Sequence, residues 1–232
     1  MKRPTKTLGV LGGMGPAATA EFMRLLACLA PADVDQEHPE VIVYNHTATP
    51  DRTTHILGKG PDPMPQLRVG IAKLVEWGSD VLVVTCNTAH YFLDQIRSQI
   101  PVPLIHIVEE TIRQAQKLSP RGAWLTSTLG TAQTGLYQKH SALMGYSFHY
   151  PTQLEQADIH DITDQVKAGD TQKAGERYRQ VIRMLQKRAD LPIVGACTEL
   201  PLAYRYTGME EGRFISCLES LAKGAIQYLY AL

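Results

Sequence analysis

The chain has 232 residues, of which 44% are hydrophobic and 20% are charged. This balance predicts a globular protein, large enough for one big domain or two small ones, with a substantial buried core. Lysine plus arginine and aspartate plus glutamate number 23 each, so the formal net charge is zero. The absence of a basic face or polybasic tail argues against nucleic acid or an anionic membrane as the main partner.

The N-terminal apolar run is cut short by Gly12, Gly13, Gly15 and Pro16. It is too short for the apolar region of a signal peptide, and no cleavage site of small residues follows it. No run of 18 apolar residues occurs that could span a membrane. We therefore expect a cytoplasmic protein.

Along the first half of the chain, apolar runs bounded by turn residues alternate with helical patterns. Strands are predicted at residues 7–11, 41–44, 81–84 and 104–107, and helices at 17–29, 66–77, 89–98 and 109–118. A long loop is predicted from 46 to 63. The solid apolar run at 81–84 indicates a strand that is buried on both faces.

The second half continues in the same style. Strands are predicted at residues 123–126, 146–150 and 192–194, and helices at 134–144, 157–168, 172–187 and 214–230. Strands that alternate with helices predict parallel sheets covered by helices, which is the α/β class.

The two halves also resemble each other. Each opens with a strand and a turn rich in glycine or threonine, and each later carries an apolar strand that ends in a cysteine, Cys86 or Cys197, about half the chain apart. We therefore expect two similar Rossmann-like subdomains with mainly parallel sheets, related by a pseudo-two-fold axis. The N-terminal lobe is expected at 1–118, the C-terminal lobe at 119–210, and a closing helix at 211–232 that can pack back onto the first lobe. Ligands bind beyond the carboxyl ends of parallel strands, so the active site is expected in a cleft between the lobes.

Four cysteines occur, at positions 28, 86, 197 and 217. None lies in a CxxC pair and the eight histidines are scattered, so no zinc-binding spacing is present and no metal site is expected. Disulfides are not expected in a cytoplasmic chain. Cys28 and Cys217 lie in helix-like runs without chemical context, which is typical of small buried hydrophobic residues.

Cys86 follows a predicted buried strand and precedes Asn87, Thr88 and a predicted helix. Free backbone N–H groups and the positive end of a helix dipole lower a thiol pKa from about 8.5 toward neutrality, and they can also hold a carboxylate. Taken alone, Cys86 could equally be a buried residue beside a helix N-terminus.

Cys197 repeats this arrangement with Thr198 and Glu199 in the matching place of the second half. The repetition favours a chemical role. A racemase removes a proton from one face of a carbon and returns a proton to the other face, which takes two acid/base groups on opposite sides. Two thiols with pKa values near neutrality suit this work.

Six motifs in one order now make the chain resemble the aspartate/glutamate racemase family over nearly its full length, and within it the aspartate racemase branch. They are Leu-Gly-Gly-Met (11–14), Pro-Asp-Arg-Thr (50–53), Cys-Asn-Thr-Ala-His (86–90), Gly-Thr-Ala-Gln-Thr-Gly-Leu-Tyr (130–137), Val-Lys-Ala-Gly (166–169) and Cys-Thr-Glu-Leu-Pro (197–201). The resemblance implies a racemase of acidic amino acids that needs no cofactor, including no pyridoxal phosphate, and that forms a homodimer.

The resemblance also implies roles for single residues. Cys86 and Cys197 would be the catalytic thiols, with Glu199 supporting the second from behind. The α-carboxylate and amino end of the substrate would bind at four residues: Asn87, Thr88, Thr128 and Thr198. Gly13 and Met14 would shape the floor of the cleft.

Two cations are implied for the substrate side chain. Arg52 matches the arginine that grips the side-chain carboxylate, and a guanidinium fork suits bidentate binding of a carboxylate. Lys167 matches a second cation of the aspartate racemases. The alternatives are a solvated loop arginine at Arg52 and an ordinary helix end at Lys167.

The chain departs from the family pattern at Ala196, because the family often has glycine directly before the second cysteine and here Gly195 comes one residue earlier. This change could tilt the thiol or narrow the site. Some relatives carry threonine in place of the first cysteine and handle one enantiomer selectively. Both thiols are kept here, which favours action on both enantiomers.

Other functions were weighed against this one. Residues 13–18 fit a GxGxxA dinucleotide-binding pattern, but the second predicted strand ends at Asn45 and His46 without the acidic residue that such a site requires. Sister enzymes on the same scaffold remain open: glutamate, hydantoin or broad-specificity racemases, or lyases and isomerases of malonate or maleate. Arylmalonate decarboxylases keep only one of the two cysteines. A dicarboxylate-binding protein without turnover would bind aspartate but exchange no α-hydrogen.

Overall fold

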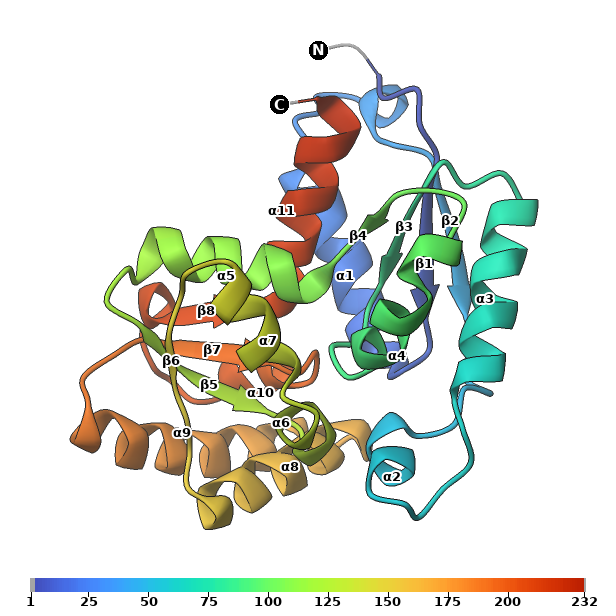
Figure 1. Ribbon diagram of the computed structural model, residues 1–232. Helices are drawn as coiled ribbons and strands as arrows, with labels where there is room; N and C mark the ends of the chain where they lie inside the picture. The colour runs from blue at the N-terminus through green and yellow to red at the C-terminus, as the bar shows by residue number, and fades with distance from the viewer. Residues whose placement is uncertain (1–2, 232) are drawn as a thin grey trace. The chain divides into compact units, whose positions relative to one another are not determined.

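The first half of the chain builds a four-stranded parallel sheet in the computed structural model, which describes residues 3–231 (Figure 1). The strand order is β2-β1-β3-β4, and every pair is parallel. The strands are β1 (Leu8–Gly12), β2 (Val41–Asn45), β3 (Val81–Val84) and β4 (Leu104–Ile105). Central strands β1 and β3 are fully buried, whereas edge strand β2 is only partly buried.

Helices cover both faces of this sheet. Figure 1 shows α1 (Pro16–Leu29) and α3 (Met64–Glu76) on opposite sides of it. Leucine and isoleucine side chains of α3 pack with α4 (Ala89–Ile96) and with the apolar side chains of β1 and β3 into one core. Their spacing at three and four residues is the amphipathic pattern that predicted these helices.

The second half builds a second parallel sheet with the equivalent strand order, β6-β5-β7-β8. Its strands are β5 (Ala123–Ser127), β6 (Phe148–His149), β7 (Ile193–Ala196) and β8 (Phe214–Ser216). Its core is formed by α8 (Gln153–Lys167), α9 (Thr171–Arg188) and α10 (Leu200–Tyr204) against β5 and β7. The prediction of an α/β chain with two similar parallel sheets is confirmed.

The chain divides into two compact units. The first runs to Ile107 and includes the segment from Leu218 onwards, and the second is Val108–Cys217. Most of the closing helix α11 (Cys217–Tyr230) therefore belongs with the first sheet, where Tyr230 Oη donates a hydrogen bond to the Glu37 carbonyl at 2.8 Å. These bounds differ from the expected lobe ends at 118 and 210. The helix α5 (Ile107–Leu118) lies almost wholly in the second unit, and β8 extends that unit beyond residue 210 by pairing with β7.

Four local features differ from the predictions. The expected loop 46–63 contains helix α2 (Arg52–Ile56), which is capped by the Asp51 carboxylate. The expected helix 134–144 is present as α7 (Leu136–Leu143), but the short helix α6 (Leu129–Gln133) that precedes it was not predicted; Gly135, whose φ of 63° is left-handed, separates the two. The expected helix 214–230 begins as strand β8, which pairs with β7. Finally, α10 follows Cys197 where no helix was predicted.

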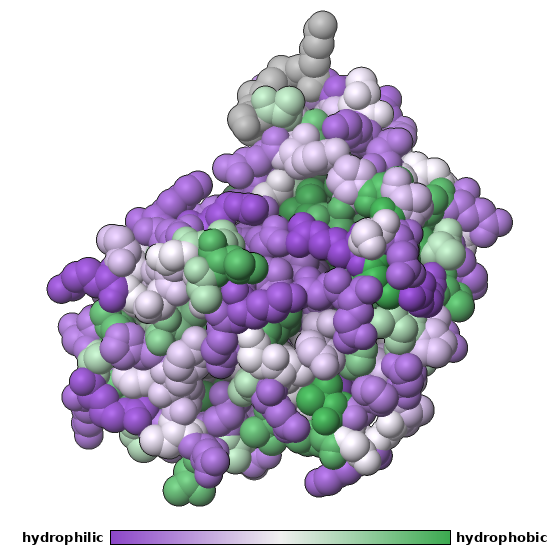
Figure 2. Space-filling view, viewed as in Figure 1, coloured by the Kyte–Doolittle hydropathy of each residue, from purple (hydrophilic) through white to green (hydrophobic). Residues whose placement is uncertain are grey.

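Among residues 3–231, no helix is long and apolar enough to cross a membrane. Hydrophilic side chains cover much of the face shown in Figure 2, and apolar residues on that face form small separate patches. Of the two cysteines expected to be buried, Cys217 is buried, but Cys28 is exposed. Cys28 lies on the outer side of α1 beside Arg24, whereas Phe22 and Leu26 of that helix turn to the core.

Candidate active site

Cys86 stands at the carboxyl end of β3, where the chain turns into α4. The turn residues Cys86, Asn87 and Thr88 are all buried, with exposed fractions of 5%, 2% and 5%. Thr88 is the residue that precedes the first turn of α4. The strand–turn–helix arrangement expected around Cys86 is therefore present, with a thiol and two polar side chains at a helix N-terminus.

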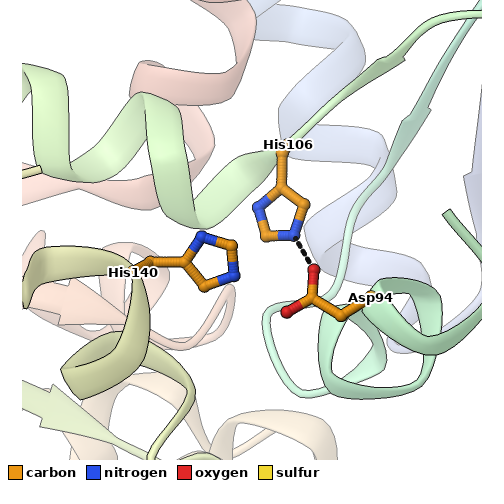
Figure 3. Close-up of side chains that lie close together, drawn as sticks. All are labelled: Asp94, His106 and His140. Carbon is orange, nitrogen blue, oxygen red and sulfur yellow. Dashed lines mark hydrogen bonds and ion pairs between the residues drawn. The ribbon is translucent and has the colours of Figure 1, made fainter. Parts of the chain in front are cut away.

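A hydrogen bond from the His90 side chain stabilises the Cys86 turn. The Nδ1 atom of His90 lies 2.8 Å from the carbonyl oxygen of Cys86. Because a carbonyl only accepts, Nδ1 carries the proton and donates it. The rings of His90 and His106 pack edge to face, with their centroids 4.3 Å apart. His106 Nε2 in turn lies 3.2 Å from Asp94 Oδ1 (Figure 3). The sequence motif at 86–90 includes His90. Its hydrogen bond to the Cys86 carbonyl could not be predicted from the motif, because it depends on the conformation of the turn.

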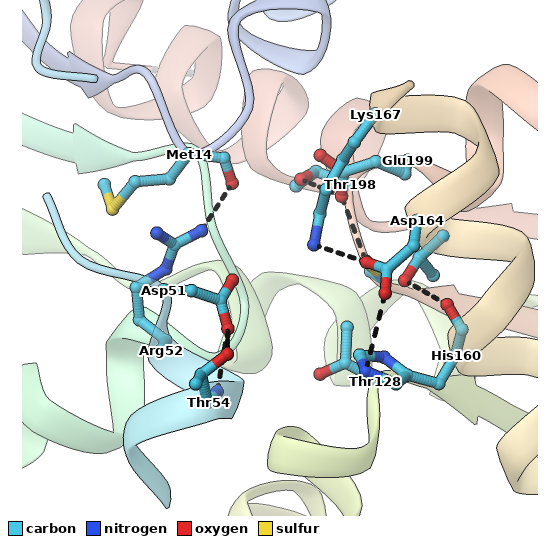
Figure 4. A network of polar contacts seen from close by, with 12 residues as sticks. Met14, Asp51, Arg52, Thr54, Thr128, His160, Asp164, Lys167, Thr198 and Glu199 are labelled. Atoms are coloured by element: carbon cyan, nitrogen blue, oxygen red, sulfur yellow. Dashed lines mark hydrogen bonds and ion pairs between the residues drawn. The ribbon is translucent and has the colours of Figure 1, made fainter. Parts of the chain in front are cut away.

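Arg52 is buried rather than solvated, with 8% of its surface exposed, so the alternative of a solvated loop arginine is wrong. Its Nη1 donates to the Pro50 carbonyl at 3.1 Å, and its Nη2 donates to the Met14 carbonyl at 3.2 Å (Figure 4). Asp51 fixes the start of α2 by accepting hydrogen bonds from the backbone and hydroxyl of Thr54. Arg52 therefore stands on a defined helical turn.

The topology explains why these residues gather in the first unit. Parallel strands end at the same edge of a sheet, so the segments that follow β1, β2 and β3 meet there. Met14 follows β1, the loop to Arg52 follows β2, and Cys86 follows β3. The structure thus joins three predicted site residues that lie far apart in the sequence.

Cys197 directly follows β7 in the second unit and is 5% exposed. Its Sγ donates a hydrogen bond to Glu199 Oε2 at 3.0 Å, and Thr198 Oγ1 donates to the same oxygen at 3.1 Å. Glu199 is itself 3% exposed. The three residues form one buried polar group at the carboxyl edge of the second sheet.

The expectation of a near-neutral thiol is wrong for Cys197. Burial raises the pKa of the Cys197 thiol well above its usual range, and the neighbouring charge of Glu199 raises it further. The positive charge of Lys167 opposes this rise without cancelling it. A hydrogen bond with the backbone of Glu199, the residue before α10, also lowers the pKa of the thiol, but it is the smallest of these effects.

Lys167 lies in the last turn of α8 and is electrostatically coupled to the Cys197 group. Its Nζ lies 3.0 Å from Asp164 Oδ1 (Figure 4). Burial works to lower the pKa of Lys167, but the electrostatic interactions with Cys197, Glu199 and Asp164 together raise it above its ordinary value. Lys167 therefore interacts electrostatically with the Cys197 group from the last turn of α8.

Thr128 follows β5, so it lies at the same edge of the sheet as Cys197. Its hydroxyl oxygen accepts a hydrogen bond from the backbone N–H of Thr131 at 3.2 Å and caps α6. Nearby, Ala196 is fully buried, and Gly195 has no room for a side chain because a Cβ there would lie 2.4 Å from Phe214 Cζ. The lack of a side chain at Gly195 therefore allows Phe214 of β8 to pack against β7.

Comparison with known proteins agrees with this arrangement. The family model of the Asp/Glu/Hydantoin racemases matches residues 11–215. The chain belongs to this family. It is also similar in sequence to the broad specificity amino-acid racemase RacX of Bacillus subtilis (strain 168), with 29% identity over 198 residues, covering 83% of this chain and 85% of that protein.

Solved structures of this family have the same fold. An aspartate racemase of Picrophilus torridus superposes with a TM-score of 0.83 at 26% identity, covering 96% of this chain and 93% of that one. A glutamate racemase isoform of Bacillus anthracis has a TM-score of 0.66 at 20% identity, covering 99% and 83%. The chain is therefore an amino-acid racemase by family.

Proposed function

We propose that this racemase interconverts L- and D-aspartate without pyridoxal phosphate, by a two-base mechanism with Cys86 and Cys197. One observation carries the proposal: each cysteine follows the equivalent central strand, β3 or β7, of two sheets that share one strand order. Each is followed by buried polar residues. Two equivalent acid/base groups are what proton transfer on both faces of a carbon needs.

The proton balance is simple. For one enantiomer, the thiolate of one cysteine removes the α-proton and becomes a thiol, while the thiol of the other cysteine donates its proton to the opposite face and becomes a thiolate. The reverse reaction exchanges the two roles. N–H groups around the α-carboxylate and the substrate ammonium stabilise the carbanionic intermediate.

Glu199 supports Cys197 in this scheme. In the resting structure Cys197 is a buried thiol that donates to Glu199 at 3.0 Å. To act as a base, Cys197 must first lose that proton, and the Glu199 carboxylate is the acceptor in contact with it. Glu199 acts through the thiol and does not need to touch the substrate.

Substrate choice falls to two cations, the buried Arg52 and Lys167 in the last turn of α8. Arg52 binds the distal carboxylate, with Lys167 as a second cation, while Asn87, Thr88, Thr128 and Thr198 hold the α-carboxylate and ammonium end and Met14 lines the floor. A desolvated arginine without a matching anion rejects apolar side chains. The similarity to an aspartate racemase at 26% identity also supports aspartate.

The test is racemisation of L-aspartate by the purified protein without added pyridoxal phosphate, compared with C86S and C197S. We expect activity in the parent protein and its loss in both variants, with C28S as the control that keeps it. Full activity in either active-site variant would remove that thiol from the mechanism. Dependence on added cofactor would refute the mechanism as a whole, and binding of aspartate without α-hydrogen exchange would indicate a binding protein.

A second candidate is a broad-specificity racemase, which the similarity to RacX over 83% of the chain favours. Initial rates across aspartate, glutamate, alanine and lysine separate the two. A rate for aspartate far above the others supports the first proposal, and comparable rates support the second. A preference for glutamate would indicate that the site accepts one more methylene.

We further propose that the protein acts in the cytoplasm as a homodimer, following the family resemblance. Light scattering after size-exclusion chromatography tests the dimer: a mass near 51 kDa, twice the 25.7 kDa chain, is expected. A mass of one chain would contradict it.

A further inference from the structure

Thr19, one turn into α1, lies at the centre of a buried polar cluster in the first unit. It is 3% exposed. Its hydroxyl oxygen accepts a hydrogen bond from the Gly13 N–H at 3.1 Å, and it lies 3.2 Å from both the Gly15 carbonyl and the Thr85 hydroxyl. One side chain thus contacts the turn after β1 and the residue before Cys86.

The protons of this cluster can be assigned. The Gly15 carbonyl can only accept, so Thr19 donates its single hydroxyl proton there. Thr85 is then the donor in the contact between the two hydroxyls. Thr85 is fully buried, and its backbone N–H is also bound, to the Leu11 carbonyl at 3.1 Å. The end of β3 is therefore tied to β1 and α1 immediately before the thiol.

The same turn contacts the arginine on its other side. The Met14 carbonyl accepts from Arg52, and the Gly12 carbonyl accepts from the His46 N–H at 3.1 Å. Gly13 has a φ of +88°, and a Cβ there would lie 2.7 Å from the His46 backbone. The turn after β1 therefore packs tightly against the start of the loop that leads to Arg52.

Close packing holds Thr19 in this position. A Cβ on Gly12 would lie 2.4 Å from both Cγ2 and Oγ1 of Thr19, so the threonine packs directly against the end of β1 and occupies the space that a side chain at position 12 would need. From these contacts we infer that Thr19 is a positioning residue, which fixes Cys86 and Arg52 relative to each other through the turn 12–15. The inference rests on the proposed function, in which Cys86 moves the proton and Arg52 selects the substrate.

The first test is Thr19→Val, which keeps the shape and removes the hydroxyl. We expect the KM for aspartate to rise and the preference for aspartate over alanine to fall, each roughly tenfold, since a misplaced binding group can cost up to about 10² in rate. Thr19→Ser keeps the hydroxyl and should recover most of both. Thr85→Val cuts only the link to Cys86, so it should lower kcat with a smaller change in KM.

Thr207→Val is the matched control. Thr207 is also fully buried, accepts from a backbone N–H (Met209, 3.1 Å) and donates to a carbonyl (Tyr204, 2.7 Å), but it lies in the second unit after α10. The Thr207→Val protein should be less stable than the parent, but its KM for aspartate and its substrate preference should be unchanged. If Thr207→Val and Thr19→Val changed these quantities equally, Thr19 would be a structural residue only.

Labelling with iodoacetamide and peptide mass spectrometry gives a readout without turnover. The labelling rate of exposed Cys28 measures the reactivity of the reagent, and the labelling rate of buried Cys217 measures general opening of the fold. In Thr19→Val we expect Cys86 to label several times faster relative to Cys28, with Cys217 unchanged. Unchanged Cys86 labelling together with an unchanged KM would overturn the inference. If the parent protein does not racemise aspartate, the proposed function fails, while the labelling still tests the link from Thr19 to Cys86.

Discussion

Cys197 Sγ donates a hydrogen bond to Glu199 Oε2 at 3.0 Å inside the second unit, where both residues are at least 95% buried. A buried carboxylate next to a buried thiol raises the pKa of that thiol and is also the nearest acceptor for its proton. The contact therefore holds Cys197 as a thiol in the resting structure, and in the proposed mechanism it is also the route by which the thiol loses its proton.

Replacing Glu199 by glutamine removes the proton acceptor and keeps the size of the side chain. We expect kcat/KM to fall roughly 10²-fold, at the low end of what acid–base groups contribute. The loss should be equal for L- and D-aspartate, because the equilibrium constant of a racemisation is one. Polarimetry from each enantiomer measures it. Exposed Glu211 gives the control E211Q, and parent-level activity in E199Q would exclude the role of Glu199.

The buried thiol also predicts a dependence of stability on pH. The pKa of Cys197 is higher in the folded than in the unfolded chain, so the folded state holds this proton longer. Its contribution to stability is complete below the unfolded pKa of about 8.5 and is lost as pH rises above it, by up to about 1.4 kcal/mol per pH unit.

Urea unfolding of the parent and C197S between pH 7.5 and 9.5 tests this dependence, in a range below the ordinary tyrosine pKa of about 10. We expect the free energy of unfolding to decline more steeply in the parent than in C197S. Parallel curves would show that Cys197 ionises alike in both states.

Replacing Arg52 by lysine keeps the positive charge but removes the planar, forked set of N–H donors of the guanidinium group. The guanidinium of Arg52 uses Nη1 and Nη2 on separate carbonyls, which an ammonium group cannot reproduce. We expect R52K to lose about 1–3 kcal/mol of transition-state binding for aspartate, roughly 10- to 200-fold in kcat/KM, with little change for alanine. Exposed Arg121 gives the control R121K. An equal loss for both substrates would mean that Arg52 does not select the substrate.

Removing the charge of Lys167 should make Cys197 less reactive. Lys167 opposes the rise of the Cys197 pKa that burial and Glu199 cause. In K167Q we therefore expect slower alkylation of Cys197 at pH 8 and a higher KM for aspartate. Lys173, an exposed lysine paired with Asp170 in the same unit, supplies the control K173Q. Unchanged alkylation would place Lys167 outside the electrostatics of the thiol.

The sequence allowed the sheets and the two cysteine turns to be predicted because their signals are local. Mostly apolar runs mark β1, β3, β5 and β7, and small polar residues after β3 and β7 mark the turns. The equivalent order of the two sheets follows from the repeated alternation of strand and helix, as the parallel connections require.

Features that depend on distant contacts could not be predicted from the sequence. Helix α2 is short, and its Arg52 is held by the carbonyl of Met14, 38 residues earlier. Residues 214–216 continue the helical pattern of α11, but pairing with β7 makes them a strand. The raised pKa of Cys197 was missed because Cys197 was treated by analogy with Cys86, and the burial beside Glu199 was not considered. Likewise, the link from Thr19 to the Cys86 turn gives no local signal, since Thr85 lies 66 residues later in the sequence.

The direct test of the two-base mechanism is the fate of the α-hydrogen when the protein acts on L-aspartate in heavy water. We expect the first D-aspartate formed to carry deuterium at Cα, while recovered L-aspartate keeps its original hydrogen, as chiral separation and mass spectrometry would show. D-aspartate that retains the original hydrogen, or L-aspartate that exchanges as fast as product forms, would mean that one group serves both faces and would contradict the roles of Cys86 and Cys197.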